Sequence, residues 1–260
     1  MADLEHDLEI VRTLDELAAN AWPAPVQQQL ESWKLRAASG LTRRANSVYT
    51  SGPMPQHPDW LREVTGFYAR RDLPVRFQIS DGSPPGLVAL LDELGYSREA
   101  YTEVQTASVA QVLAQRVGTV EWEVLNSLYL EEAWLEAFLR IEGYDPALRD
   151  MYLTIMSAIG PAARFASVRL NREMVGVGMA VSERGWTGLF NIATAQHMRG
   201  RGVATAIVRD LAQWSAEQGA EHLYLQVMTS NEVAKRLYEK LGFSYLYGYH
   251  YRTEPPEPRN

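Results

Sequence analysis

The stretch EHLYLQVMTSNEVAKRLYEKLGF, Glu221–Phe243, has the clearest structural pattern in the chain. Its first part, EHLYLQVM, alternates aliphatic residues with tyrosine, glutamine and methionine, which is the period of a β-strand with two different faces. After it, Asn231 is a candidate N-cap, and Gly242 suits the left-handed stop of a helix. The stretch therefore predicts a strand that leads directly into a short helix.

The same kind of pattern extends upstream. Apolar residues from Val203 to Trp214 recur with the three-and-four spacing of an amphipathic helix, which should end at Gly219. Before that helix, the text predicts two helices and then three strands. The helices are expected at 130–143 and 146–160, and the strands at 163–170, 173–183 and 186–195.

The first half repeats the end of this order. LLDELGYSREAYTEVQT, Leu90–Thr106, aligns with LYEKLGFSYLYGYHYRT, Leu237–Thr253, at a constant offset. The elements around the first copy also alternate, with strands expected at 41–50, 74–80 and 100–108 and helices at 57–72 and 84–96. Internal duplication explains both the matching residues and the matching order of strands and helices. The alternative is that glycine followed by an apolar residue is simply a common helix ending.

Composition narrows the classes of function. The formal net charge of −7 argues against general affinity for nucleic acids or acidic membranes, which carry the same sign. The chain has no cysteine, so disulfides, thiolate metal sites and cysteine nucleophiles are excluded. The acidic start MADLEHDLEIVRTLDEL has neither a basic leader nor an apolar run, and we expect a cytoplasmic protein.

The segment QHMRGRGVATA, Gln196–Ala206, carries the strongest chemical signal. Two glycines at the mouth of a helix let the backbone approach a ligand closely, and the first free amides of the helix suit an anion. The segment lacks the GK[ST] of a nucleotide P-loop and the full GxGxxG fingerprint. It therefore predicts a phosphate cradle of another kind, with a flexible arginine-rich capping loop as the alternative.

The RGRGVA text and the pattern N-x-x-A-x-x-LY-x-x-LGF that follows the next strand together resemble the GNAT superfamily of acetyl-CoA-dependent N-acetyltransferases. The resemblance covers about residues 120–253. It implies an α/β (α+β) fold of two GNAT-like domains, 1–115 and 116–260, each with a mixed, mostly antiparallel sheet flanked by helices. The first domain would be a truncated, degenerate copy, and the second would be catalytic.

The resemblance also implies how acetyl-CoA binds. The backbone amides of the RGRGVA segment would hold its diphosphate, and backbone groups of Ile192 and Thr194 would bind the acetyl and pantetheine portion. Asn231 and Ala234 would flank the pantetheine arm. The residues of the diphosphate loop are Arg199, Gly200, Arg201, Gly202, Val203 and Ala204.

Tyr238 is the candidate catalytic residue. Amine attack on a thioester develops an oxyanion and then releases a thiolate, so a proton source near the sulfur assists the reaction. A phenol with an ordinary pKa of about 10 is protonated at neutral pH and can donate. In the superfamily, tyrosine at this motif position often has this role. The alternative is a tyrosine that packs its ring on the sheet.

The general base is not evident, because the expected strand 186–195 has no acidic residue. Proton removal could run through water, or through Glu142 in the loop between the first two helices of the second half. Asn191, Gln226 and Tyr144 could line the acceptor pocket, although ordinary packing or solvation explains each of these residues equally well.

The first copy lacks this equipment. It has Leu91 in place of Tyr238 and Pro84 in place of Asn231, and neither replacement can offer the same hydrogen bonds. We expect a structural role for this half. Polar side chains of the segment SWKLRAASGLTRRANSVYT could select the acceptor, or they could belong to an edge strand with solvated arginines. The residues concerned are Trp33, Arg36, Arg43, Arg44 and Asn46.

The sequence thus predicts direct transfer of an acetyl group from acetyl-CoA to a primary amine of a small molecule, without a metal, by a monomer or homodimer. Acetylation of a protein lysine or N-terminus is one alternative. A non-catalytic acyl-CoA sensor is another. Fold alone does not fix the acceptor.

Overall fold

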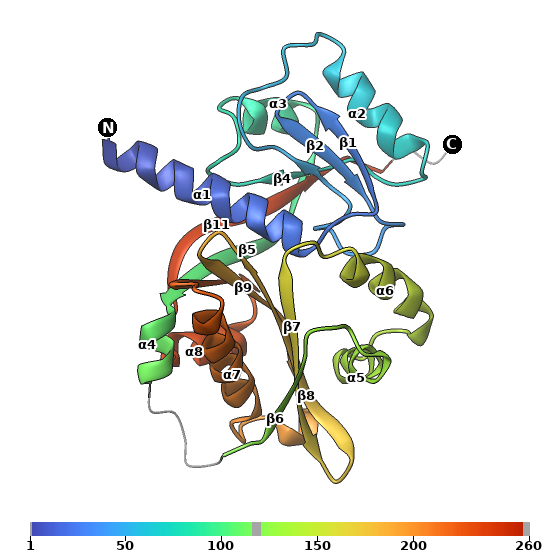
Figure 1. Cartoon of the computed structure of the whole chain (residues 1–260). Helices are drawn as coiled ribbons and strands as arrows, with labels where there is room; N and C mark the ends of the chain where they lie inside the picture. Colours follow the sequence, from blue (N-terminus) through green and yellow to red (C-terminus); the bar gives the residue numbers. More distant parts are fainter. Residues whose placement is uncertain (1, 116–120, 257–260) are drawn as a thin grey trace. The chain divides into compact units, whose positions relative to one another are not determined.

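The computed structural model describes residues 2–115 and 121–256. By their internal contacts the residues form two compact units (Figure 1). Unit 1 comprises residues 1–102 and 247–260, and unit 2 comprises residues 103–246. The fold is mixed α/β, with parallel and antiparallel strands flanked by helices.

Unit 1 contains a sheet of order β1-β2-β3-β4-β11-β5. β3 pairs with β4 in parallel, and β11 pairs with β4 in antiparallel orientation. An aromatic cluster lies in its core, where the rings of Trp33 and Trp60 meet edge to face with centroids 5.3 Å apart. Its elements are α1 (Ala2–Ala21), β1 (Val26–Leu30), β2 (Trp33–Ala37), β3 (Val48–Tyr49), α2 (Trp60–Ala69), β4 (Arg76–Ile79), α3 (Leu87–Glu93), β5 (Ser97–Ser108) and β11 (Ser244–Thr253), of which β5 and β11 have residues in both units.

Unit 2 contains the strand order β5-β10-β9-β8-β7-β6, in which β6 to β9 are antiparallel neighbours and β9 and β10 are parallel. Its further elements are α4 (Val109–Ala114), β6 (Val124–Ser127), α5 (Glu132–Glu142), η1 (Pro146–Leu148), α6 (Arg149–Ser157), β7 (Ala162–Leu170), β8 (Glu173–Glu183), β9 (Trp186–Thr194), η2 (Gln196–Met198), α7 (Val203–Glu217), β10 (His222–Met228) and α8 (Glu232–Lys240).

Most elements expected from the sequence are present near their expected bounds, and β1, α4 and β6 were missed. The strand expected at 41–50 is wrong except for Val48–Tyr49. The side chain of Asn46 explains this loop, because its amide accepts from the backbone of Ala38 and Gly40 and donates to the carbonyls of Leu41 and Thr42. These bonds replace the ladder partners of a strand.

The division of the chain into units differs from the expected boundary between residues 115 and 116. Residues 247–253 of β11 belong to unit 1, where His250 and Tyr251 face Ile79 and Gln78 of β4. Unit 1 is therefore discontinuous in sequence, which a single cut in the chain cannot represent.

The expectation of solvated arginines in the segment 32–50 is wrong for Arg36. This side chain is 3% exposed and donates to the carbonyl and hydroxyl of Ser47 and to Oε1 of Gln78, the last at 2.8 Å. Arg43, by contrast, keeps solvent contact and forms an ion pair of 2.8 Å with Glu99. Arg36 therefore belongs to the interior of unit 1.

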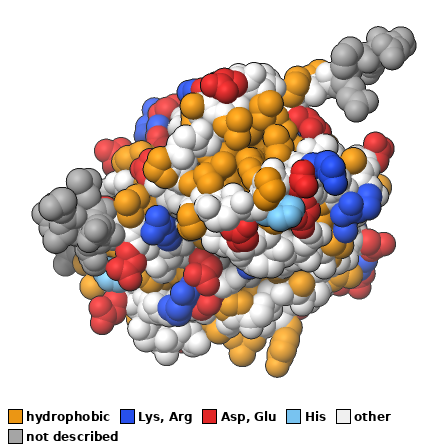
Figure 2. All heavy atoms as spheres, turned by 90° about the horizontal axis from the view of Figure 1, so that it is seen from above, with side chains coloured by type: hydrophobic (Ala, Val, Ile, Leu, Met, Phe, Trp, Pro, Cys, Tyr) orange, Lys and Arg blue, Asp and Glu red, His pale blue; other side chains and the backbone are white. Residues whose placement is uncertain are grey.

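Hydrophobic side chains gather on the face of unit 1 that Figure 2 shows. The partly buried apolar residues around the core of unit 1 are Met54, Leu61, Leu73, Val88, Leu90 and Tyr96.

Within residues 2–115 and 121–256, no helix has the length and apolar character needed to cross a membrane.

In unit 2, α7 covers one face of the strands, and α5 and α6 cover the other (Figure 1). The α7 face depends on two glycines of β8. A Cβ at Gly176 would lie 2.3 Å from Cγ1 of Val203, and a Cβ at Gly178 would lie 2.6 Å from Ile192 and Ile207. On the opposite face, Trp134 of α5 packs edge to face on Phe165. The glycines thus let α7 lie unusually close to the sheet.

We expect Gly178→Ala to lower the free energy of unfolding by about 1–3 kcal/mol, because the added methyl group overpacks the contact with α7. Gly160→Ala is the matched control, since no heavy atom lies within 4 Å of the added carbon there. Urea unfolding followed by circular dichroism measures both variants. Equal stability of the two variants would contradict the close-packing argument.

A buried carboxylate ties α1 to the rest of unit 1. Asp15 is 3% exposed and accepts hydrogen bonds from the hydroxyls of Ser80, at 2.5 Å, and Tyr247, at 2.7 Å. Burial raises the pKa of Asp15 to about 6, although both hydrogen bonds and the charge of Arg36 oppose the shift. The folded protein therefore binds this proton more tightly than the unfolded chain does.

The contribution of Asp15 to stability is fully present below its unfolded pKa of about 4 and is lost as the pH rises to about 6. Relative to Asp15→Asn, the wild type should lose about 2 kcal/mol of unfolding free energy between pH 4 and 7. Urea unfolding of both proteins across this range tests the expectation, and the comparison cancels every other titrating group. Parallel pH profiles would show that Asp15 stays ionised in the folded state.

Candidate active site

The parallel strands β9 and β10 separate within unit 2. Their pairing runs from Trp186 opposite His222 to Leu189 opposite Leu225, while β9 continues to Thr194 and β10 to Met228. The backbone groups past the last pair are therefore released from this ladder.

A β-bulge lies in the same part of β9. The register with β8 shifts between Val177 and Met179, whose partners are Ala193 and Phe190, so β9 has one extra residue here. Asn191 lies in this bulge with φ 54°, a left-handed conformation that is uncommon outside glycine. The bulge redirects the backbone that leads into the glycine loop.

Ile192 and Thr194, the expected backbone ligands, are half-buried and follow the bulge. The Oγ1 atom of Thr194 is buried and has no hydrogen-bond partner among the described residues. Such a group is costly to leave unpaired, so it marks a place where a polar ligand atom would be favourable. The carbonyl of Thr194 accepts a long hydrogen bond of 3.4 Å from Arg199.

The glycine loop forms the mouth of α7. Gly200 and Gly202 have φ values of 74° and 82°, so each needs the left-handed freedom of glycine. Residues 199–202 are exposed, Val203 is buried and Ala204 is half-buried. Among the described residues, no backbone carbonyl of a turn, loop or helix cap accepts a hydrogen bond from the amides of residues 200–205. Unpaired amides and the positive end of the helix dipole favour an anion here.

Trp122 contacts this loop, although sequence reasoning missed it. Its indole N–H donates to the carbonyl of Arg201 at 2.8 Å, and its Nε1 lies 4.0 Å from the Cβ position of Gly202. The two partners are 79 residues apart in sequence. The hydrogen bond between Trp122 and Arg201 cannot be predicted from a local sequence pattern.

Tyr238 lies on α8 with its ring buried and edge to face with Phe243, at a centroid distance of 5.8 Å. Its hydroxyl makes no hydrogen bond to any described residue. Burial, and then the charge of Glu142, raise the pKa of Tyr238 to about 12. The phenol is therefore protonated at neutral pH. The helix is capped by Asn231, whose side chain accepts from the amide of Ala234 at 3.1 Å.

Glu142 is the last residue of α5 rather than a loop residue, and Gly143 ends the helix in a left-handed conformation. Its carboxylate keeps contact with solvent, yet desolvation by the surrounding protein raises its pKa, and the charge of Arg199 opposes this shift. Glu142 also raises the pKa of Tyr238. The structure thus brings Glu142 within electrostatic reach of both the glycine loop and the tyrosine.

The other proposed acceptor residues come from different segments of unit 2. Tyr144 follows α5, is 39% exposed and stacks on Tyr152 with ring centroids 5.7 Å apart. The Nδ2 atom of Asn191 donates to the sulfur of Met179 at 3.3 Å. Gln226 is half-buried on β10, one residue past the last pair with β9. Their assignment to an acceptor pocket stays a prediction.

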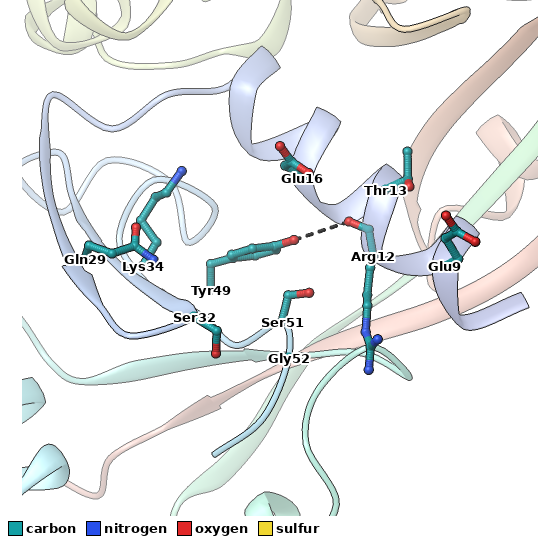
Figure 3. A pocket seen from close by; sticks show the side chains of 10 residues that line it. All are labelled: Glu9, Arg12, Thr13, Glu16, Gln29, Ser32, Lys34, Tyr49, Ser51 and Gly52. Atoms are coloured by element: carbon teal, nitrogen blue, oxygen red, sulfur yellow. Dashed lines mark hydrogen bonds between the residues drawn. The ribbon is translucent and has the colours of Figure 1, made fainter. Parts of the chain in front are cut away.

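A cavity of about 670 Å³ lies in unit 1 and shares no residue with these candidates. Figure 3 shows it between one face of α1 and the segments around β1, β2 and β3, with Tyr49 donating to the carbonyl of Arg12. Its four charged side chains are two cations and two anions, so the lining selects no ligand charge. These are Glu9, Arg12, Glu16 and Lys34.

Among the described residues, no three His, Asp or Glu side chains cluster so as to hold a metal ion.

Comparison with known proteins gives consistent matches. The family model described as "Probable histone acetyltransferase Rv0428c C-terminal" matches residues 9–252. The uncharacterized N-acetyltransferase YobR of Bacillus subtilis is 34% identical over 251 residues, which cover 95% of this chain and 100% of YobR.

Solved structures agree on the fold. A GCN5-related N-acetyltransferase from Kribbella flavida superposes with a TM-score of 0.67 at 15% identity, covering 94% of this chain and 95% of that one. A tandem GNAT protein from the clavulanic acid biosynthesis pathway gives a TM-score of 0.66 at 11% identity, covering 94% and 89%. Together with the family match over almost the whole chain, these similarities show that the protein belongs to the Rv0428c C-terminal family and to the GNAT superfamily of acetyltransferases.

Proposed function

We propose that this acetyltransferase moves the acetyl group of acetyl-CoA directly to a primary amine of a small molecule, and that unit 2 carries out the reaction. The observation that carries the proposal is the set of unpaired amides at the mouth of α7. The buried phenol of Tyr238, whose pKa is raised by burial and by the charge of Glu142, supports it. An anion site and a pair of proton-handling groups are the parts that this chemistry needs.

The residues of unit 2 fit acetyl-CoA. The amides from Gly200 to Ala204 would bind the diphosphate, whereas the amide of Arg199, also expected there, already donates to the carbonyl of Gln196 at 3.3 Å. The side chains of Arg199 and Arg201 would add positive charge beside the diphosphate. Backbone groups of Ile192 and the orphaned hydroxyl of Thr194 lie where the bulge and the strand divergence release polar groups. Asn231 and Ala234 at the start of α8 would flank the pantetheine arm.

Tyr238 and Glu142 would have opposite roles in proton transfer, one as the acid and the other as the base. Acetyl-CoA supplies the acetyl group as an activated thioester. Tyr238, with its raised pKa, holds a proton that it can donate at the departing sulfur. Glu142, an anion at the end of α5, would attract the acceptor's ammonium group and take up one proton from it. The raised pKa of Glu142 makes it a stronger base than an ordinary glutamate.

The acceptor class has two candidates. The net charge of −7 and the carboxylate of Glu142 favour a cationic acceptor of either class. A small-molecule amine is our choice, and the similarity to the streptothricin acetyltransferase of Streptomyces lavendulae, 31% identical over 84 residues, supports it. The family description as a probable histone acetyltransferase favours a protein lysine as the second candidate. Unit 1 would be a structural copy, since Leu91 in the position of Tyr238 is fully buried.

A screen for free CoA release with purified protein tests the proposal. The panel contains amino acids, polyamines, aminoglycosides and lysine peptides, including histone tails. Release with a small amine supports our choice, and release with peptides alone supports the second candidate. Tight binding of acetyl-CoA without turnover on any amine would identify a sensor and overturn the proposal.

We expect Tyr238→Phe to lower kcat by about 100-fold or more, with the dissociation constant of acetyl-CoA unchanged, because only a proton donor is removed. Tyr129→Phe is the control, since Tyr129 is 79% exposed. Steady-state kinetics and calorimetry measure the two quantities. Normal turnover by Tyr238→Phe would rule out the acid role.

We expect Glu142→Gln to raise the KM for the amine and lower kcat by about 100-fold, with little change in the KM for acetyl-CoA. The wild-type rate should fall as the pH drops through the raised pKa of Glu142, because only the carboxylate accepts a proton. This acidic limb should disappear in the variant. Glu136→Gln on the same helix should leave the pH profile unchanged. An identical acidic limb in Glu142→Gln would remove Glu142 from the mechanism.

A further inference from the structure

We propose that Trp122 is a positioning residue for the diphosphate of acetyl-CoA, because its hydrogen bond to Arg201 sets the direction of the neighbouring amide in the glycine loop. The inference rests on the proposed function of that loop. It concerns a residue outside both sequence motifs.

The argument begins with the geometry of the peptide bond. A trans peptide is planar, so the carbonyl of Arg201 and the N–H of Gly202 point in opposite directions. The indole N–H of Trp122 holds that carbonyl at 2.8 Å. The N–H of Gly202 is thereby directed away from Trp122, and no described residue accepts a backbone hydrogen bond from it. An oriented, unpaired amide is the kind of donor that a phosphate oxygen needs.

The loop needs such a constraint because glycine flanks the peptide. Gly200 and Gly202 both have positive φ, and glycine crosses between left-handed and right-handed conformations at little cost. The peptide between Arg201 and Gly202 could therefore rotate and present its carbonyl, rather than its N–H, to an anion. The bond from Trp122 disfavours that rotation before the ligand arrives.

Trp122 is itself anchored. The indole is half-buried and packs against the core of unit 2, as does Val124 two residues later. The packing of Trp122 and Val124 against this core gives the indole a fixed base.

The test compares Trp122→Phe with wild type on two donors. Acetyl-CoA has the diphosphate, whereas S-acetylpantetheine lacks it and retains the thioester. We expect the KM for acetyl-CoA to rise about three- to tenfold, which corresponds to the loss of one hydrogen bond. The KM for S-acetylpantetheine and kcat with either donor should stay unchanged. Trp186→Phe, which also replaces an indole of unit 2, should affect neither donor.

The outcomes separate the two proposals. Wild-type protein that binds neither donor would refute the proposed function itself. Wild-type activity with an unchanged KM in Trp122→Phe would refute only the role of Trp122. An equal loss on both donors, or loss of folding, would assign Trp122 to general structure and also refute that role.

Discussion

The close contact between α7 and β8 is the constraint on which unit 2 depends. Gly176 and Gly178 bring the backbone of the strand against Val203 and Ile207 of the helix. Because the first turn of α7 contains Val203, this contact also fixes where the unpaired amides lie. The contact at Gly178 also includes the side chain of Ile192, which lies just past the bulge of β9. The anion site and the released backbone groups therefore share one rigid support.

The sequence allowed prediction of those features that depend on local pattern. Alternation predicted β10, spacing predicted α7, and glycine endings predicted the stops of α7 and α8, because neighbouring residues determine each. The glycine loop was also predictable from adjacent residues. Packing decided the rest. Three features depend on partners far away in sequence, which no short stretch of sequence contains. They are the left-handed bulge at Asn191, the burial of Arg36 and the bond between Trp122 and Arg201.

The link between Glu142, Tyr238 and Arg199 illustrates the same limit. Sequence reasoning proposed each residue for a separate reason, and it placed Glu142 in a loop. Its position at the end of α5, where the helix dipole disfavours a negative charge, gives it an electrostatic cost that ordinary surface glutamates avoid. Desolvation adds to that cost. The elements β4, α3 and β5 follow one another in the same order as β10, α8 and β11, and internal duplication stays a prediction.

The assignment of residues 247–253 to unit 1 has a consequence for biosynthesis. β4 needs β11 as its antiparallel neighbour, and Tyr247 supplies a hydrogen bond to the buried Asp15. Every residue of unit 2 leaves the ribosome before these partners do. Unit 1 therefore cannot complete its sheet, or pair its buried carboxylate with Tyr247, until the residues that follow unit 2 in the chain have been made. In this chain the half that is translated first depends on residues that are translated after the other half.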